Sequence, residues 1–280
     1  MQRLNRWLYP DTAERTYQRL FIKRLRELKA EFLRRLRGIN LLRIDDLQID
    51  ADEETWSDDL ELQIAAIMGW WFVSVQALRI EFAVLFNQLS QFNDKQFRLA
   101  VKQLTNVSIA QSQSFGLNAA DLVTPTMAAK DILGQTADVS RVEEYITAIK
   151  KNFVATSITS FDKLGQLFIQ TSEIELRRLV GNGAKVNEII ADINNRLAKY
   201  EKQAVLASRG IVARVNAELT QRRLVSMGLN EYIWHTCLDE RVRPTHRANE
   251  GEKFQWAKPP AVTGHPGHDY LCRCWPEAVK

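Results

Sequence analysis

The sequence predicts a mainly α fold, in which a body of long helices is followed by a small, turn-rich α+β lobe at the C-terminus. Apolar residues recur at helical spacing over most of the first 228 residues. After Gly228 this periodicity stops, and five of the seven prolines lie in the final 37 residues. With 45% apolar and 26% charged residues, the 280-residue chain has an ordinary globular composition.

The first predicted helix starts at Asp11 or Thr12, both suitable N-caps, and stops at Gly38. Its apolar stripe consists of Phe21, Leu25, Leu28, Phe32 and Leu36. Residues 1–43 contain twelve Lys or Arg against four Asp or Glu, whereas residues 44–63 contain nine acidic residues and no basic one. The basic residues off the stripe favour a solvated helix face, with contact to an acidic protein or to DNA phosphates as the alternative.

The next predicted helix, Leu60–Phe92, is apolar on most faces, which indicates burial on several sides. Within it, Trp70 and Trp71 are expected to be core or interface anchors. Its charge-free run, Leu62–Leu78, contains polar residues and falls short of the roughly 20 apolar residues that a membrane span needs. We therefore expect a buried helix and no membrane span. Asp94–Asn106 is a shorter amphipathic helix.

Further helices follow an interruption at Ser114–Asp138, which contains two glycines and a proline. A capping box, Ser140-x-x-Glu143, precedes a helix over Val142–Val180. The turn Asn182-Gly183 leads into apolar residues at helical spacing up to Leu197, and a last helix covers about Lys202–Ser226. We expect an N-terminal helical region at 1–113, a helical body at 114–228 and a C-terminal lobe at 229–280, with a short strand at 231–236.

All four histidines and all three cysteines lie in the C-terminal lobe, between His235 and Cys274. No secretory signal is visible at the N-terminus, so we expect an intracellular protein with reduced thiols. An odd number of cysteines, two of them spaced as Cys272-x-Cys274, fits a metal site or free thiols better than a disulfide framework.

A metal site would use thiol and imidazole ligands from this cluster. In an extended Cys272-Arg273-Cys274 segment both thiols point to one side, and two histidines from His246, His265 and His268 would complete a tetrahedral set around one structural zinc ion. Cys237 is a substitute ligand. The alternative is a hydrogen-bonded cluster of neutral histidines and buried thiols that stabilises proline-rich loops.

A metal-dependent hydrolase or nuclease would use the same residue types. Acidic residues and histidines between Asp239 and Asp269 could form its centre, and Arg241, Arg243 and Arg273 could contact phosphate. The sequence contains no nucleophile elbow, phosphate loop or HExxH pattern. We therefore expect no enzymatic activity and keep the nuclease-like enzyme as the alternative.

A series of motifs runs through the C-terminal lobe. A D-x-R-x-R-P-x-H segment is formed by Asp239, Arg241, Arg243, Pro244 and His246. A glycine, an aromatic residue and a Pro-Pro pair follow at Gly251, Phe254, Pro259 and Pro260. A closing H-P-G-x-D-x-x-C-R-C is formed by His265, Pro266, Gly267, Asp269, Cys272, Arg273 and Cys274. This series resembles the C-terminal domain of the phage Mu F-like minor head (head morphogenesis) proteins. Cys237 departs from the family pattern, and His268 matches it less well than His265.

The resemblance implies a low-copy structural protein of a tailed-phage head. Such a protein is made in the host bacterial cytoplasm and is built into the head interior or portal vertex through portal, scaffold or major head proteins. It is linked to head assembly and to DNA packaging or delivery. The site is then expected to contain His246, His265, Cys272 and Cys274, with the other motif residues bracing it.

Overall fold

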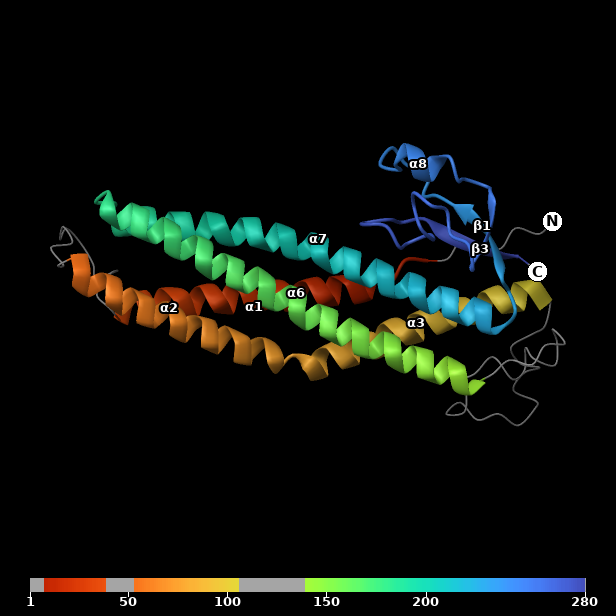
Figure 1. The fold of residues 1–280 in the computed structure, drawn as a ribbon, viewed down its shortest axis with the longest axis horizontal. Coiled ribbons are helices and arrows are strands. Elements are labelled where there is room, and N and C mark those ends of the chain that lie inside the picture. Colours follow the sequence, from red (N-terminus) through yellow and green to blue (C-terminus); the bar gives the residue numbers. More distant parts are fainter. Residues whose placement is uncertain (1–7, 39–52, 106–138, 280) are drawn as a thin grey trace. The chain divides into compact units, whose positions relative to one another are not determined.

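The computed structural model describes residues 8–38, 53–105 and 139–279 and confirms the predicted fold class. Its long helices are α1 (Asp11–Gly38), α2 (Glu53–Gln76), α3 (Arg79–Thr105), α6 (Val139–Gly181) and α7 (Val186–Ser226) (Figure 1). The C-terminal lobe contains β1 (Glu231–His235), the short helix α8 (Pro244–Arg247), β2 (Lys253–Gln255) and β3 (Trp275–Val279). The sequence interruption at 114–138 lies outside the described residues.

Helix boundaries differ from the sequence prediction at several places: α2 already begins at Glu53, and the separately predicted helix Asp94–Asn106 is part of α3. The predicted helix over 60–92 is divided by a turn at Ala77-Leu78, so that α2 ends at Gln76 and α3 runs on past Phe92. The two helices predicted on either side of residue 200 form one continuous helix, α7, because Tyr200 is itself buried and extends the apolar stripe. The turn between α6 and α7 was predicted correctly, and Gly183 adopts the positive φ of 69° that it requires.

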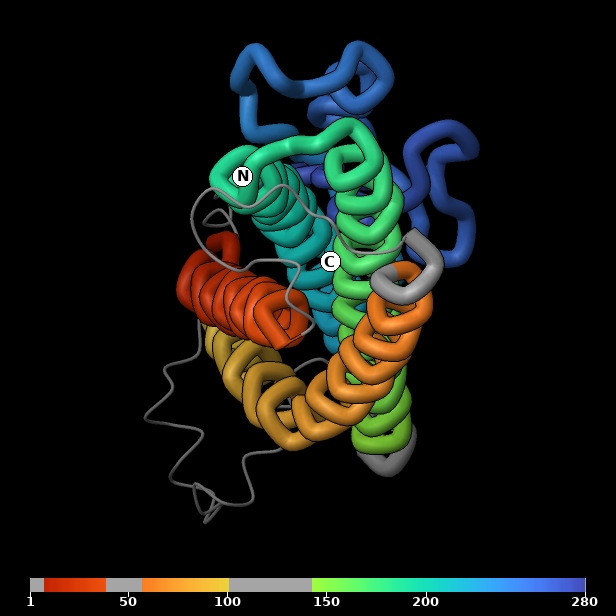
Figure 2. The backbone as a smooth tube through the Cα atoms, turned by 90° about the vertical axis from the view of Figure 1, so that its left-hand side faces the viewer, coloured from red at the N-terminus to blue at the C-terminus, as the bar shows by residue number. Residues whose placement is uncertain are grey.

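The chain packs as two compact units, each assembled from separated segments. Unit 1 comprises Met1–Glu14, Ala83–Val154 and Arg209–Lys280, and unit 2 comprises Arg15–Phe82 and Ala155–Ser208. In unit 2, α6 and α7 lie side by side and antiparallel (Figures 1 and 2). They are joined there by the contact between the hydroxyls of Thr171 and Tyr200, which lie 3.1 Å apart.

Aromatic rings fill the core of unit 2. The apolar stripe of α1 is fully buried, and Phe21 stacks on Phe161 of α6 with ring centroids 3.5 Å apart. The Trp71 ring covers Gly165, and its Nε1 donates to the backbone carbonyl of Asp162 at 3.2 Å. A glycine is needed at position 165 because a Cβ there would lie 2.0 Å from Cε2 of Trp71.

The described stretch Ser57–Ala100 is apolar enough, and its helices long enough, to meet the length and composition requirement for crossing a membrane. Of its most apolar window, 33% is buried inside the structure. Core helices meet the same requirement, and Trp71, Val75 and Phe82 in this stretch are fully buried. The stretch is therefore only weak evidence for a membrane span.

In unit 1, a buried polar network joins α3 to α7. Asn93 Nδ2 donates to Thr220 Oγ1 at 2.8 Å, and the Arg223 guanidinium donates to Asn93 Oδ1 and to Ser90 Oγ. Burial lowers the pKa of Arg223 to about 10, so this side chain remains charged at neutral pH. The Arg223 guanidinium therefore fixes α7 on α3, because its N–H groups would be buried without acceptors if the two helices separated slightly.

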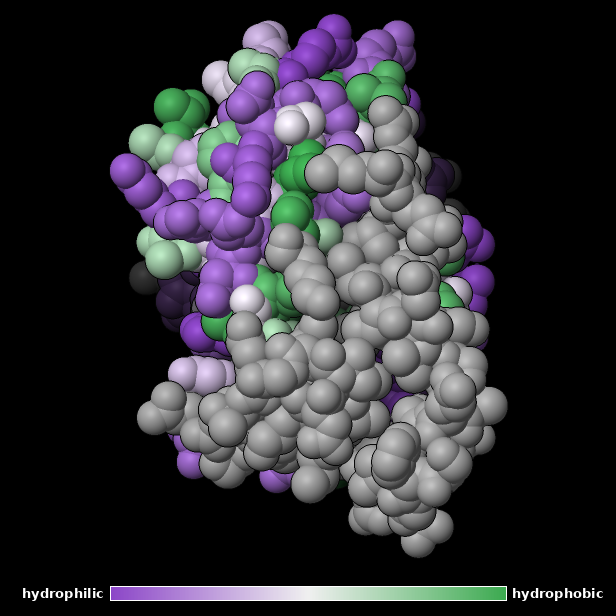
Figure 3. Space-filling model, turned by 90° about the vertical axis from the view of Figure 1, so that its right-hand side faces the viewer, coloured by the Kyte–Doolittle hydropathy of each residue, from purple (hydrophilic) through white to green (hydrophobic). Residues whose placement is uncertain are grey.

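The lobe docks on this helix pair through an apolar cluster. Its antiparallel sheet has the order β2-β1-β3, and alternate residues of β1, Tyr232 and Trp234, face inward and are fully buried. They join Phe97 and Ala100 of α3 and Leu224 of α7 in one core. On the face drawn in Figure 3, the described residues show mostly hydrophilic surface with small, separate hydrophobic groups.

Substitution of the glycine below Trp71 tests the packing of unit 2. We expect Gly165→Ala to lower the free energy of unfolding by about 2 kcal/mol, because the added Cβ displaces a buried ring and its hydrogen bond. Gly69→Ala in α2 is the matched control: nothing lies within 4 Å of an added Cβ there. It should raise stability by about 0.5–1 kcal/mol through its higher helix propensity. Equal effects of the two variants in urea unfolding would contradict the packing described here.

Candidate metal centre

Three side chains from the lobe meet below the sheet. Pro244 opens α8, whose single turn directs His246 inward, where its ring contacts Trp234 edge-to-face with centroids 5.5 Å apart. Cys272 and Cys274 come from the segment that leads into β3. His246 and Cys272 are buried, with 2% and 5% of their surface exposed. The lobe therefore brings one imidazole and two thiols together.

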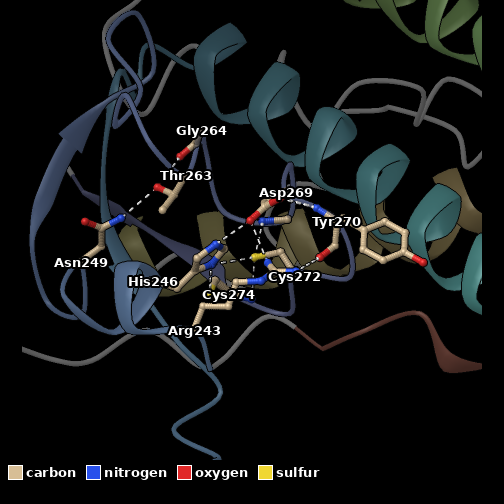
Figure 4. Close-up of polar contacts among 10 residues, drawn as sticks. Arg243, His246, Asn249, Thr263, Gly264, Asp269, Tyr270, Cys272 and Cys274 are labelled. Atoms are coloured by element: carbon tan, nitrogen blue, oxygen red, sulfur yellow. Dashed lines mark hydrogen bonds and ion pairs between the residues drawn. The ribbon is translucent and has the colours of Figure 1, made fainter. Parts of the chain in front are cut away.

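The distances among these groups fit a tetrahedral metal ion. Figure 4 shows His246, Cys272 and Cys274 side by side. His246 Nδ1 lies 3.4 Å from Cys272 Sγ and 3.4 Å from Cys274 Sγ, and all three ligand atoms lie within 4.8 Å of one another. An ion that binds sulfur at about 2.3 Å and nitrogen at about 2.0 Å holds those two atoms about 3.5 Å apart. The three residues could therefore hold one ion with little movement.

The other ring nitrogen of His246 is held by a carboxylate. Asp269 Oδ2 lies 3.0 Å from His246 Nε2 and accepts a hydrogen bond of 2.7 Å from Arg243 Nη1. Arg243 also donates to the carbonyl of Tyr270 at 2.6 Å. Burial raises the pKa of Asp269, but the hydrogen bond from His246 and the nearby Arg243 lower it more, so the net shift is downward. Such a carboxylate fixes the tautomer that leaves Nδ1 free to bind a metal.

Backbone donors favour a thiolate at Cys272. The hydrogen bond with Cys274 lowers the pKa of Cys272 to about 6, with burial opposing it, and the N–H groups of Gly267 and Cys274 point at its Sγ at 3.3 and 3.4 Å. The pKa of Cys274 is raised by its hydrogen bond with Cys272, by burial, and by the charge of a Cys272 thiolate. A bound cation would reverse this and ionise both thiols.

Gly267 connects this centre to helix α7. It has φ of 82°, and an added Cβ would lie 2.7 Å from the Cβ of Ala217. A larger residue would therefore push the 264–268 turn away from α7 and move the N–H donor away from Cys272. The glycine of the H-P-G segment is required by both the backbone angle and the packing.

His265, which the sequence placed among the ligands, lies outside this group. Its Nδ1 lies 2.9 Å from Tyr232 Oη, and its Nε2 lies 3.1 Å from the carbonyl of Trp256. Since the carbonyl can only accept, Nε2 carries the proton, and Nδ1 accepts from the tyrosine hydroxyl. His268 stacks edge-to-face on His265 with centroids 5.4 Å apart and does not join the three ligands.

A second, half-buried polar cluster was not predicted from the sequence. His235, at the end of β1, lies between two glutamates. Its Nδ1 is 2.9 Å from Glu250 Oε1, and its Nε2 is 2.6 Å from Glu277 Oε2. Glu250 also accepts a hydrogen bond from the backbone N–H of Thr236. In the sequence, only the alternation of residues along β1 could have indicated this position, because it places His235 on the face opposite Trp234.

The remaining motif residues brace the lobe. Asp239 pairs with Arg273 and accepts the N–H of Arg241 at 3.1 Å. Gly251, with φ of 78°, donates its N–H to the carbonyl of Trp234 at 2.8 Å. Phe254 lies opposite Tyr232 across β1 and β2. The segments before and after β2 are joined by a hydrogen bond of 3.0 Å from Asn249 Nδ2 to Thr263 Oγ1 (Figure 4).

Cys237 lies at the same cavity as the three candidate ligands. Its Sγ donates to the carbonyl of Arg273 at 2.9 Å. The cavity has a volume of about 310 Å³, and the ligand side chains share its wall with four arginines: Arg209, Arg241, Arg243 and Arg273. The three ligands thus face an accessible, positively charged space.

Comparison with known proteins gives a family match for the C-terminal part of the chain. Residues 170–276 match the family described as phage Mu protein F like protein. This region belongs to the phage Mu F-like head morphogenesis family. The F-like region contains every motif residue on which the sequence resemblance rested, from Asp239 to Cys274.

One protein similar to this chain is an uncharacterized protein of Haemophilus influenzae, which is 41% identical over 92 residues. The aligned part covers 33% of this chain and 21% of the relative, so the chain spans about a fifth of that protein's length. No solved structure matches the chain.

The neutral state of His265 predicts a pH dependence of stability. Burial lowers its pKa from 6.5 to about 4, and the nearby His268 acts in the same direction. The unfolded chain binds this proton below about pH 6.5 whereas the folded chain does not, so acid favours unfolding over this window. Between pH 7 and 4.5, metal-free wild type should lose about 1–2 kcal/mol more stability than His265→Gln. Parallel pH profiles in urea unfolding would show that His265 is not buried as a neutral group.

Proposed function

We propose that this protein is a minor structural component of a tailed-phage head that is incorporated during head assembly. The observation that carries the proposal is the F-like region, which spans 170–276 and contains the end of α6, all of α7 and most of the lobe with its motif. The family indicates a phage head morphogenesis protein. We place the protein at the head interior or portal vertex, with a role in DNA packaging or delivery and without catalytic activity.

The proposed partners are portal, scaffold or major head proteins, and helix α2 supplies the contact. Beside its buried stripe, α2 and the first turn of α3 expose large apolar side chains on the opposite side. Leu62, Phe72, Val73 and Ile80 are 66%, 52%, 67% and 75% exposed. Exposed apolar side chains gathered along one helix face are typical of a protein-binding surface.

Contact between the basic helix α1 and DNA receives less support. Lys23 and Arg24 pair with Glu27, and Arg34 and Arg35 pair with Glu31. Arg26 pairs with Glu201 of α7 at 2.7 Å. These glutamates neutralise part of the positive charge that a phosphate contact, one of the alternatives to a solvated helix face, would need. We therefore favour protein partners for this helix over genomic DNA.

We further propose that the lobe binds one structural zinc ion through His246, Cys272 and Cys274. Two thiolates and one imidazole are ligands that zinc prefers. The support is the match of the 3.4 Å nitrogen–sulfur separations to a tetrahedral ion and the carboxylate behind His246. The ion would hold α8 to the segment before β3 and so stabilise a lobe with few regular hydrogen bonds.

A metal-dependent nuclease-like enzyme is the second candidate. Three protein ligands that face a cavity with four arginines would suit a phosphate substrate. An enzyme of this kind should cleave nucleic acid in the presence of added divalent metal and lose that activity in His246→Ala. A structural head protein should show no turnover and should co-purify with heads, which mass spectrometry of purified particles would detect.

Loss of both thiols tests the role of the lobe in assembly. We expect the double variant Cys272→Ser, Cys274→Ser to be destabilised by about 2–4 kcal/mol and to be incorporated less into heads, because His246 and the 272–274 segment lose their common partner. Val262→Ser is the control, since this side chain of the same lobe is 79% exposed. Particle composition and infectivity are compared for both variants. Normal heads with normal amounts of the double variant would refute the proposal that this centre is required.

A further inference from the structure

The three candidate ligands leave one position of a tetrahedral ion unassigned. A catalytic zinc site keeps that position open for water or substrate, whereas a structural site fills it with a fourth protein ligand. The identity of the fourth ligand therefore decides which of the two candidate functions the centre can serve. Resting on the proposed zinc site, we infer that Cys237 is the fourth ligand and that the centre is a closed site with three cysteines and one histidine.

Strand pairing brings Cys237 to the segment that carries the two other cysteines. The ladder between β1 and β3 ends with His235 opposite Trp275. Just beyond this end of the ladder, the Cys237 Sγ donates to the Arg273 carbonyl at 2.9 Å. That carbonyl stands between Cys272 and Cys274, so the third thiol is in contact with the backbone that joins the other two.

The cavity gives Cys237 access to the ion. Cys237, His246, Cys272 and Cys274 line the same space. As placed, the Cys237 Sγ lies outside the group of three ligand atoms that are within 4.8 Å of one another. Binding of zinc would therefore require a rotation about the Cα–Cβ bond of Cys237, which would exchange its hydrogen bond with the Arg273 carbonyl for a bond to the metal. Thiol hydrogen bonds are weak, so this exchange favours the metal.

Backbone strain occurs next to Cys237 and next to Cys272. Among the described residues, the non-glycine residues with positive φ are Leu238 at 57° and Leu271 at 56°. One directly follows Cys237 and the other directly precedes Cys272. The left-handed conformation is unfavourable for leucine, and such strain is concentrated where a site imposes it. Both turns direct a cysteine toward the same space.

The charges around the cavity agree with three thiolates. A zinc ion with three thiolates and one neutral histidine has a net charge of −1. Three of the four arginines at the cavity pair with carboxylates: Arg209 with Glu14, Arg243 with Asp269 and Arg273 with Asp239. Four arginines against three carboxylates leave a charge of +1, which balances the closed site. A site with two thiolates and a water would be neutral and would leave this charge unbalanced.

X-ray absorption at the zinc edge and cobalt substitution on the full-length chain test the inference. Wild type should show three sulfur neighbours and one nitrogen, and its sulfur-to-cobalt charge-transfer absorption should fall by about one third in Cys237→Ser, as three thiolates become two. The zinc affinity of Cys237→Ser should be more than about tenfold lower than that of wild type. Removal of a residue that only hydrogen-bonds to a ligand already costs at least about tenfold, and loss of a ligand should cost more. Cys237→His should recover most of the affinity with two sulfurs, and His268→Gln, the control, should keep all three.

The outcomes separate this inference from the proposal that zinc binds. Two sulfurs in wild type, unchanged in Cys237→Ser, would overturn the role of Cys237 and leave a zinc site open to water. Loss of a ligand in His268→Gln, rather than in Cys237→Ser, would assign the fourth position to His268 and would also overturn the role of Cys237. A wild-type chain that binds no zinc at equimolar metal would refute the zinc proposal itself. Circular dichroism of each variant establishes that the fold is retained.

Discussion

The burial of Tyr232 and Trp234 against α3 and α7 is the contact on which the C-terminal lobe depends. Strands of five, three and five residues cannot form a stable sheet alone, because they bury too little apolar surface. The two aromatic residues connect the sheet to a core that the helices provide. Each also touches a histidine: Trp234 packs on His246, and Tyr232 bonds to His265. The docking contact therefore positions the polar groups of the lobe as well as its strands.

The two buried histidines of the motif have opposite surroundings. His246 has a carboxylate at Nε2 and two thiols at Nδ1. This arrangement suits a metal ion bound by Nδ1 and the two sulfurs. His265 has a hydroxyl and a carbonyl, which suit a neutral ring. Similar residues in one sequence motif thus have different tasks: one can bind a metal, and the other ties β1 to the loop after β2.

Apolar periodicity was sufficient to predict the long helices and the change of structure at Gly228, because burial of one helix face requires that pattern. The turn at Ala77-Leu78 has no glycine or proline to signal it, and Leu78 is fully buried, so the apolar pattern continues through the turn. The sequence indicated that Cys272 and Cys274 act together, since their spacing places both thiols on one side. It could not place His265, because its partners, the hydroxyl of Tyr232 and the carbonyl of Trp256, are chosen by strand pairing and loop path. The position of His235 between two glutamates depends on strand pairing in the same way.

The long sequence separation of the contacts in unit 1 has a consequence for how the protein folds. Arg223 bonds to Asn93 across 130 residues, and Tyr9 bonds to the carbonyl of Arg209 across 200. Closing such loops costs chain entropy before any contact compensates it, so folding is slow for this arrangement. During synthesis, α3 must wait with its apolar face uncovered until α7 and the lobe have emerged from the ribosome. This interval exposes the nascent chain to aggregation and gives host chaperones a defined period in which to act.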